Sequence, residues 1–357
     1  MNKTQNGENS PPSSLLAGPP INRSFLNALD ELVARAKRGN KPDSMFFNPS
    51  DEWINERINV FQDLPQLAQE ELLKEASVVT EESAKANSAG KAATRVWPET
   101  AVRLDNGGLA FFSQLGVARR PDLTQYFIDG FPKNRDALAF SEVSQSLFAE
   151  VFSHIAERMN DLFESGEGIV QSDRRICDAP GRSFHARQLL FGTRYLQLPL
   201  LWRQLTFDLA DIEQNQPPDI LEVSIPNWLD CLGLPDELKE RIHEAGLTQL
   251  VFKAPTKGLS LHLGFDYVGE HKMGPLSIAM FMAKQANGLA VQAALSMVRA
   301  RTLEGRLTNS ALVTIGPSLH GKSTLTIMIE LAESELARLL RLQKDSQEGV
   351  YPMNDDI

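Results

Sequence analysis

The sequence predicts an α/β protein: an α+β N-terminal domain followed by a P-loop-type nucleotide-binding domain that is incomplete at its C-terminus. Three observations lead to this prediction. Helical periodicity dominates the first part of the chain, and short β-rich runs bounded by Gly and Pro follow from about residue 168. Near the C-terminus, a glycine-rich phosphate-loop pattern stands between a β-rich run and a helix-like run.

The length and local composition suggest how the chain divides. Its 357 residues are enough for roughly two domains. Residues 1–22 are rich in Asn, Ser, Pro and Gly and bury too little apolar surface to order themselves, so we expect a flexible tail. We expect an N-terminal domain with a helical start over 23–285 and a partial P-loop domain over 286–357.

Three segments show the amphipathic spacing of helices. Residues 24–39 place apolar side chains on one face, and Gly39 predicts the stop. Residues 64–86 are also helix-like, and the clearest pattern runs over 137–166. Its apolar residues recur at spacings of three and four: Leu147, Phe148, Val151, Phe152, Ile155 and Met159.

The second half of the chain contains the predicted strands. Short strands are expected within 168–181 and 249–265, where Gly and Pro interrupt β-rich runs. The apolar, Ala-rich run 274–300 fits a strand or a buried helix, and periodicity alone does not separate the two. Residues 310–316 form a β-rich run before a predicted helix over 322–345, and 349–357 resembles a final strand.

The charge balance argues against two classes of partner. The chain has 46 acidic and 36 basic residues, a formal net charge of −10, and no basic stripe. Nucleic acid and anionic membrane surfaces are therefore poor candidate partners. No apolar run approaches the ~18 residues of a membrane span, and the N-terminus lacks the apolar core of a secretory signal. We expect a cytoplasmic protein.

The two cysteines, Cys177 and Cys231, give neither a metal-binding spacing nor a disulfide framework. Free Cys is among the most frequently buried residue types, and a reducing compartment keeps thiols unpaired. We expect two buried thiols.

The stretch GPSLHGKSTLT carries the strongest motif, G-x-x-x-x-G-K-S, from Gly316 to Ser323. Glycines let consecutive backbone N–H groups turn into one concavity, and the following helix directs its positive end there. Lys322 would reach the outer phosphates, and the Ser323 hydroxyl would reach Mg²⁺. The residues expected to contact the nucleotide are Gly316, Ser318, Leu319, His320, Gly321, Lys322, Ser323 and Thr324.

A second acidic element fits a nucleotide site. Asp355 and Asp356 follow the last predicted strand, where an acidic residue can hold the metal that bridges the phosphates. The expected Mg²⁺ ligands are therefore Ser323, Asp355 and Asp356. A solvated acidic terminus is the alternative interpretation of the two aspartates.

Several segments together resemble the ATP-dependent phosphoenolpyruvate carboxykinases. The family's loop reads G-L-S-G-T-G-K-T-T-L-S, which GPSLHGKSTLT matches at Ser318 and in its Thr324–Leu325 tail. The family's Tyr-x-Gly-Glu-Met-Lys-Lys-Gly segment is similar to YVGEHKMG at 267–274. Weaker likenesses lie at ICDAPG, LLWRQLTF, ARRPDLTQYF and NDDI, so the resemblance covers about 110–357 in the family's order.

The resemblance implies a reaction and its participants. In the parent gluconeogenic chemistry, oxaloacetate and ATP give phosphoenolpyruvate, CO₂ and ADP. By this resemblance Arg119 would hold the substrate carboxylate, Lys272 would contact the outer phosphate or substrate, and Lys322 would neutralise charge on the migrating phosphoryl group. Alternative interpretations of these residues remain open. Arg119 and Arg120 could lie on a solvated turn, Lys272 could lie on a helix surface, and Tyr267 could be a core residue.

The sequence departs from the family at its transition-metal centre. The family typically binds Mn²⁺ through a lysine, a histidine and an aspartate, but Met273 stands in the lysine position and the histidine expected shortly afterwards is absent. A thioether is a poor ligand for a hard cation, so ATP and Mg²⁺ are the expected cofactors and Mn²⁺ is doubtful. His271 lies nearby and could substitute as a ligand, but we interpret it as a partly exposed surface residue.

The chain also stops soon after the expected metal strand. The runs 310–316 and 349–357 would be core strands of a sheet, so we expect a truncated chain or one completed by a C-terminal partner.

Two classes of function therefore remain open. One is a carboxykinase-like enzyme, or a small-molecule or protein kinase on the same scaffold, acting on a nucleotide and a small carboxylate. The other is a nucleotide-binding or interaction module without chemistry.

Overall fold

The structure is a computed structural model that describes residues 21–88, 100–113, 123–129, 137–178, 181–209, 216–291, 293–316, 321, 322, 325, 339 and 349–354. The chain divides into two compact units, Met1–Phe281 and Met282–Ile357. Helices and strands mix in the first unit and its main sheet has both parallel and antiparallel pairs, as expected for an α/β protein.

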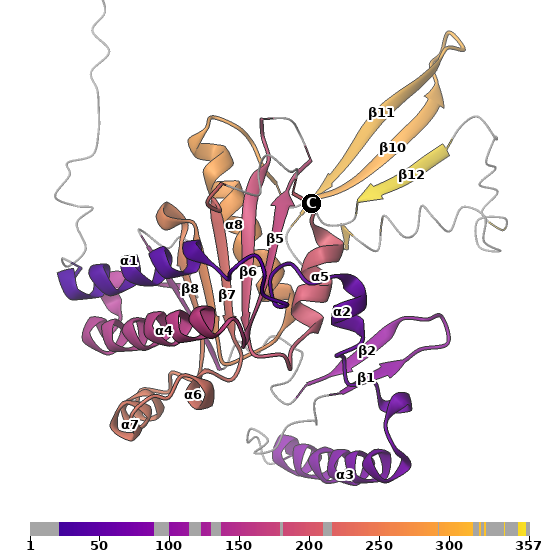
Figure 1. Cartoon of the computed structure of the whole chain (residues 1–357). Helices are drawn as coiled ribbons and strands as arrows, with labels where there is room; N and C mark the ends of the chain where they lie inside the picture. Colours follow the sequence, from indigo (N-terminus) through magenta and orange to yellow (C-terminus); the bar gives the residue numbers. More distant parts are fainter. Residues whose placement is uncertain are drawn as a thin grey trace, which may run out of the picture. The chain divides into compact units, whose positions relative to one another are not determined.

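A seven-stranded mixed sheet forms the centre of the first unit, in the order β4-β3-β8-β9-β7-β6-β5. The neighbours pair in parallel except at β8–β9 and β5–β6, which are antiparallel (Figure 1). The strands are β3 (Thr124–Ile128), β4 (Ala137–Ala139), β5 (Ile169–Ile176), β6 (Phe184–Phe191), β7 (Ile220–Ile225), β8 (Gln249–Ala254) and β9 (Leu259–Leu263).

Two long helices, α1 (Arg23–Arg38) and α4 (Gln145–Ser165), lie side by side across one face of this sheet (Figure 1). Their apolar stripes face the sheet and form one core with alternate residues of the strands. On β7, for example, Leu221, Val223 and Ile225 belong to this core. Because strand side chains alternate between faces, Glu222 and Ser224 project to the opposite face.

An aromatic group stands at the centre of that core. The ring of Phe252 on β8 packs against four other rings, with centroids 4.6 to 6.0 Å away. These rings belong to Phe127, Phe140, Phe148 and Phe152, and all of them are buried. Phe252 therefore links β3, β8 and α4 in one apolar contact group.

The end of α1 is held by a buried ion pair. Arg187 donates two hydrogen bonds of 2.7 Å to Asp173 and one of 2.6 Å to the carbonyl of Lys37. Burial alone would raise the pKa of Asp173, but Arg187, aided by His185, outweighs it and holds this pKa below its usual value. Gly39 ends α1 as expected, with φ at +71° and no room for a side chain beside Arg187.

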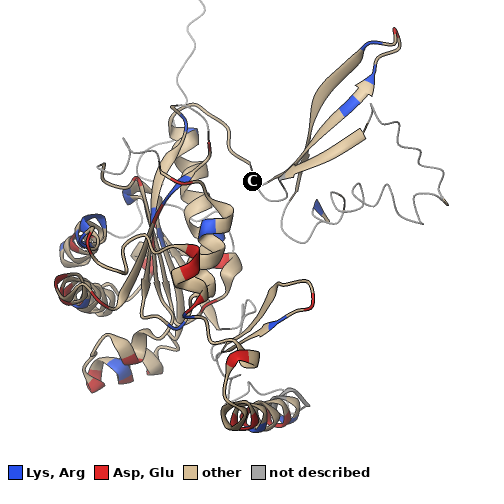
Figure 2. Cartoon of the chain, turned by 45° about the vertical axis from the view of Figure 1, so that its right-hand side comes forward, with Lys and Arg blue, Asp and Glu red and all other residues tan. Residues whose placement is uncertain are grey.

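The opposite face of the sheet is covered by α8 (Val268–Gln285), α5 (Gln197–Leu205) and α2 (Asp51–Asn55). The other helices of the first unit are α3 (Gln66–Ser88), α6 (Trp228–Cys231) and α7 (Asp236–Glu244). A separate hairpin is formed by β1 (Thr100–Arg103) and β2 (Leu109–Phe112). The described helices carry acidic and basic side chains intermingled (Figure 2).

The second unit contains a three-stranded antiparallel sheet, β11-β10-β12. Its strands are β10 (Ala293–Arg301), β11 (Leu307–Ile315) and β12 (Gly349–Asn354). The expected strands at 310–316 and 349–357 are present, but the prediction that they are core strands is wrong for the described residues. They are the two outer strands, and the side chains of Val313, Ile315 and Met353 are about half exposed or more.

Several local expectations are resolved by tertiary contacts. The ambiguous run 274–300 contains both structures, since α8 covers its first part and β10 its last. The start of the predicted helix 137–166 pairs with β3 as β4, so α4 begins only at Gln145. The thiol prediction is wrong for Cys177, which is exposed, while Cys231 is half-buried.

The expected domain boundary after residue 285 coincides with the last residue of α8, whereas the two compact units divide between Phe281 and Met282. None of the described helices combines the length and the apolar character needed to cross a bilayer.

Phe252 provides a test of the core. We expect Phe252→Ala to lower the free energy of unfolding by about 3–5 kcal/mol, because the cavity removes contacts with four neighbouring rings. Urea unfolding followed by circular dichroism measures this change. The matched control is Phe207→Ala, whose side chain is 45% exposed. Equal losses in the two variants would contradict the central role of Phe252.

Candidate functional site

The face of the sheet beneath α8 is unusually polar for a buried surface. Glu222 on β7 and His262 on β9 are both fully buried, and each lies among apolar neighbours on its own strand. The pairing of β7 with β9 places Glu222 opposite Ser260, and Ser224 opposite His262. Strand alternation therefore gathers these side chains on the face away from α1 and α4.

Helix α8 adds a third ionisable side chain to this face. His271, near its N-terminus, is only 2% exposed, so the expectation of a partly exposed surface histidine is wrong. The helix approaches β9 very closely at Gly274. A Cβ atom there would lie 2.3 Å from Ser260 Oγ and 2.6 Å from His262 Nε2, so a larger residue would displace these two side chains or move α8 away from the sheet.

Glu222, His262 and His271 form what we call the Glu–His–His cluster, in which three potential ligand atoms lie within 4.8 Å of one another. Glu222 Oε1 is 4.0 Å from Nε2 of each histidine. The two imidazole rings stack with centroids 4.6 Å apart. These separations exceed a hydrogen bond but are short enough for an ion to lie between the three groups.

Hydrogen bonds to neighbouring groups orient each member of the cluster. His271 Nδ1 lies 3.0 Å from the carbonyl oxygen of Tyr267, so Nδ1 carries the proton and Nε2 is left as the lone-pair nitrogen. The Ser224 hydroxyl donates to Glu222 Oε1. Ser260 Oγ is 2.7 Å from His262 Nε2.

Burial controls the charge of the cluster. It raises the pKa of Glu222 to about 8 and lowers that of His271 to about 4. It also lowers the pKa of His262 well below the usual value, with a further contribution from His271 and Lys253. At neutral pH, with no cation bound, the glutamic acid is protonated and both imidazoles are neutral.

A second buried carboxyl group lies just before α8. Asp266 is fully buried and accepts a 2.7 Å hydrogen bond from Gln197 Nε2 on α5. Burial raises the pKa of Asp266 to about 6, although hydrogen bonds from Ser113 and Gln197 oppose this rise.

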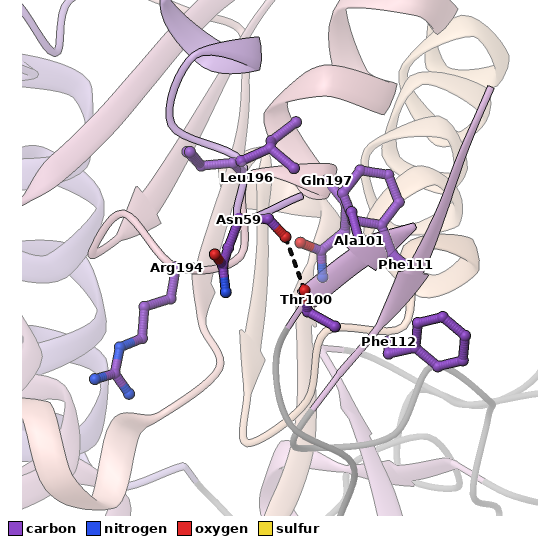
Figure 3. A pocket seen from close by; sticks show the side chains of 9 residues that line it. Asn59, Thr100, Ala101, Phe111, Phe112, Arg194, Leu196 and Gln197 are labelled. Carbon is purple, nitrogen blue, oxygen red and sulfur yellow. Dashed lines mark hydrogen bonds between the residues drawn. The ribbon is translucent and has the colours of Figure 1, made fainter. Parts of the chain in front are cut away.

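Gln197 also lines a small surface pocket beside the β1–β2 hairpin (Figure 3). Thr100 Oγ1 donates a 2.9 Å hydrogen bond to the carbonyl of Asn59 at its wall. The other lining residues are Ile58, Ala101, Phe111, Phe112, Arg194 and Leu196.

The family-like segment 267–274 forms the first turns of α8. Glu270 accepts a 2.7 Å hydrogen bond from the Tyr126 hydroxyl on β3, and Tyr267, Lys272 and Met273 are half-buried. Met273 offers only a thioether in the lysine position of the resembled family. The residues present here therefore do not fit that family's transition-metal centre.

The phosphate-loop pattern is described at its ends. It follows β11 directly, and Gly321 has φ at +82°, a conformation that favours glycine. Leu325 N donates a 2.9 Å hydrogen bond to Gly321 O, as in a first helical turn, and Lys322 is 8% exposed. The described strands beside this segment are all antiparallel, so a P-loop domain stays a prediction.

The remaining predicted site residues lie outside the described part of the chain. They are Arg119, Arg120, Ser318, Leu319, His320, Ser323, Thr324, Asp355 and Asp356. All three predicted magnesium ligands, Ser323, Asp355 and Asp356, are among these residues, so the magnesium site stays a prediction.

The Glu–His–His cluster was missed by sequence reasoning. Its signal is a polar residue at alternate positions of two apolar runs, ILEVSI and LSLHL. Such alternation ordinarily indicates a solvent-facing side, and only the covering by α8 turns that side into a buried site. No protein-family model matches this chain, and no curated protein matches it.

Asp266 provides a test of the electrostatics beneath α5. Folding raises the pKa of the Asp266 carboxyl group from 3.8 to about 6. The folded state therefore loses stability as the pH rises from about 4 to 6, and above pH 6 the loss reaches about 3 kcal/mol. We expect Asp266→Asn to remove this loss, giving a variant more stable than the wild type at pH 7 and about equal at pH 4. Urea unfolding at both values measures it, with exposed Asp105→Asn as the control. Parallel pH profiles for wild type and Asp266→Asn would contradict the burial argument.

Proposed function

We propose that this protein binds ATP at residues 316–323 and transfers its terminal phosphoryl group, as the phosphoenolpyruvate carboxykinase family that it resembles does. The observation that carries the proposal is the local geometry at Gly321: a left-handed glycine between a strand end and a first helical turn. A glycine-rich turn that opens a helix directs backbone N–H groups and the positive end of the helix dipole at one point.

The neighbouring residues suit a phosphate ligand. Lys322 follows Gly321 directly, at the start of the helical turn where the outer phosphates would lie. A loop of this kind holds phosphate by backbone amides, so the acidic balance of the whole chain does not oppose binding. ATP supplies the transferable phosphoryl group, and Mg²⁺ held by Ser323, Asp355 and Asp356 would neutralise part of its charge.

The roles of the side chains follow from charge and position. Lys322 would stabilise the negative charge that develops on the migrating phosphoryl group, and Lys272 and Arg119 would hold the anionic acceptor. The likeness favours a small carboxylate as the acceptor: in the parent reaction, oxaloacetate loses CO₂ and the resulting enolate takes the γ-phosphoryl group of ATP. Met273 weakens the case for the carboxykinase reaction itself, which in the family requires a transition metal at that position.

Removal of the Lys322 charge tests nucleotide binding. We expect Lys322→Ala to weaken ATP affinity roughly 10- to 100-fold, the loss expected for a charge-assisted contact of about 1.5–3 kcal/mol. Isothermal titration calorimetry with ATP and Mg²⁺ measures this affinity. Lys284→Ala, a change in the last turn of α8, is the control. ATP binding of equal strength in wild type and Lys322→Ala would contradict the proposed site.

A product assay separates enzyme from binding module. The carboxykinase reaction predicts that the wild-type protein, incubated with ATP, Mg²⁺, Mn²⁺ and oxaloacetate, forms phosphoenolpyruvate and ADP, detected by ³¹P NMR. Lys322→Ala should abolish the product. ATP binding without product would leave a nucleotide-binding module and would contradict the carboxykinase reaction.

A further inference from the structure

We propose that Glu222, His262 and His271 bind a divalent transition-metal ion, best matched by zinc, between the sheet and α8. This site uses none of the predicted nucleotide or magnesium ligands, and it does not depend on the proposed phosphoryl transfer. It also differs from the transition-metal position of the resembled family, where Met273 stands.

The ligand chemistry points to a transition metal. Two imidazole nitrogens and one carboxylate oxygen form the protein ligand set of several zinc sites that keep a fourth position open. Imidazole suits zinc, copper, iron and nickel, whereas calcium and magnesium prefer oxygen ligands. Glu222, His262 and His271 come from β7, β9 and α8, so one ion would join all three elements.

The distances allow the ion with small adjustments. A zinc ion about 2.0–2.2 Å from each ligand holds tetrahedral ligand atoms roughly 3.3–3.5 Å apart. Glu222 Oε1 is 4.0 Å from Nε2 of each histidine, so each Glu–His pair needs to close by about 0.5–0.7 Å. The ligand atoms of the two histidines lie within 4.8 Å of each other and need to close by at most about 1.5 Å. Coordination by His262 Nε2 would replace its present contact with the Ser260 hydroxyl.

The cluster also contains polar atoms that its protein neighbours leave unsatisfied. Within the described part of the chain, Glu222 Oε2, His262 Nδ1 and His271 Nε2 are buried and have no hydrogen-bond partner. A buried polar atom without a partner costs about 1–3 kcal/mol. The proposed ion would remove this cost at His271 Nε2, which lies 4.0 Å from Glu222 Oε1.

Outer contacts already hold two ligands in a suitable orientation. The proton on His271 Nδ1 is held by the Tyr267 carbonyl, which leaves Nε2 free to coordinate and directed toward Glu222. Ser224 fixes the carboxylate of Glu222 by donating to Oε1. Such backbone and hydroxyl contacts are typical of the groups that orient metal ligands.

Such an ion would have a structural consequence for the family-like segment. It would fasten the first turns of α8, which carry Glu270 and Lys272, to β7 and β9. Gly274 allows this contact because it lets the helix lie directly against Ser260 and His262. The metal would therefore position residues 267–274 from beneath the helix.

The experiment measures metal content and stability on the full chain. The purified protein is treated with a chelator, incubated with Zn²⁺, gel-filtered, and analysed by inductively coupled plasma mass spectrometry. We expect about one zinc ion per chain and a saturable rise in the thermal midpoint. Glu222→Gln and His271→Gln should each lower the zinc affinity at least about tenfold.

The controls separate this site from other zinc binding. Exposed His243→Ala and Cys177→Ser should keep the wild-type zinc content. Glu222→Gln preserves shape and resembles the protonated side chain, so we expect it to fold, which circular dichroism checks. If a variant does not fold, titration of the wild type with Co²⁺ tests the site instead. We expect the bound Co²⁺ to absorb strongly in the visible range, as it does in a low-coordinate site of nitrogen and oxygen ligands. The proposal would be overturned if the wild type bound no zinc and gave no cobalt spectrum. It would also be overturned if folded Glu222→Gln bound as much zinc as the wild type.

Discussion

The close contact between α8 and β9 at Gly274 sets the environment of the polar face of the sheet in the first unit. Without a Cβ atom, the helix lies directly on Ser260 and His262 and closes the polar face of the sheet to solvent. The opposite face is apolar and covered by α1 and α4, so the sheet is buried on both sides. One sheet thereby acquires an ordinary core on one face and an enclosed polar layer on the other.

The enclosed layer explains the unusual electrostatics. Little water reaches this layer to solvate charge, so Glu222 holds its proton and both histidines of the cluster stay neutral. The Asp173–Arg187 pair is also buried, but each partner supplies the charge that the other needs. The difference between the two groups is therefore the presence or absence of a fixed counter-charge, and that difference separates a structural ion pair from a candidate binding site.

The two proposed sites differ in the kind of support that they have. The phosphate-loop site is supported by a sequence motif and by backbone geometry at Gly321. The Glu–His–His cluster has no motif, because its members lie up to 49 residues apart in the chain and only folding brings them together. It is supported by distances, by burial and by the unsatisfied His271 Nε2. Either can stand without the other.

The mixed helix and strand content, the stop of α1 at Gly39 and the strand that precedes the glycine-rich loop follow from the amino-acid sequence alone, because they depend on local periodicity and backbone preference. Tertiary structure decided which face of each element is covered. The alternation in ILEVSI and LSLHL is the same for an exposed face and for one sealed by a helix, so the sequence did not reveal that Glu222, His262 and His271 meet. Burial and proximity between distant residues arise only when the strands pair and α8 packs on them.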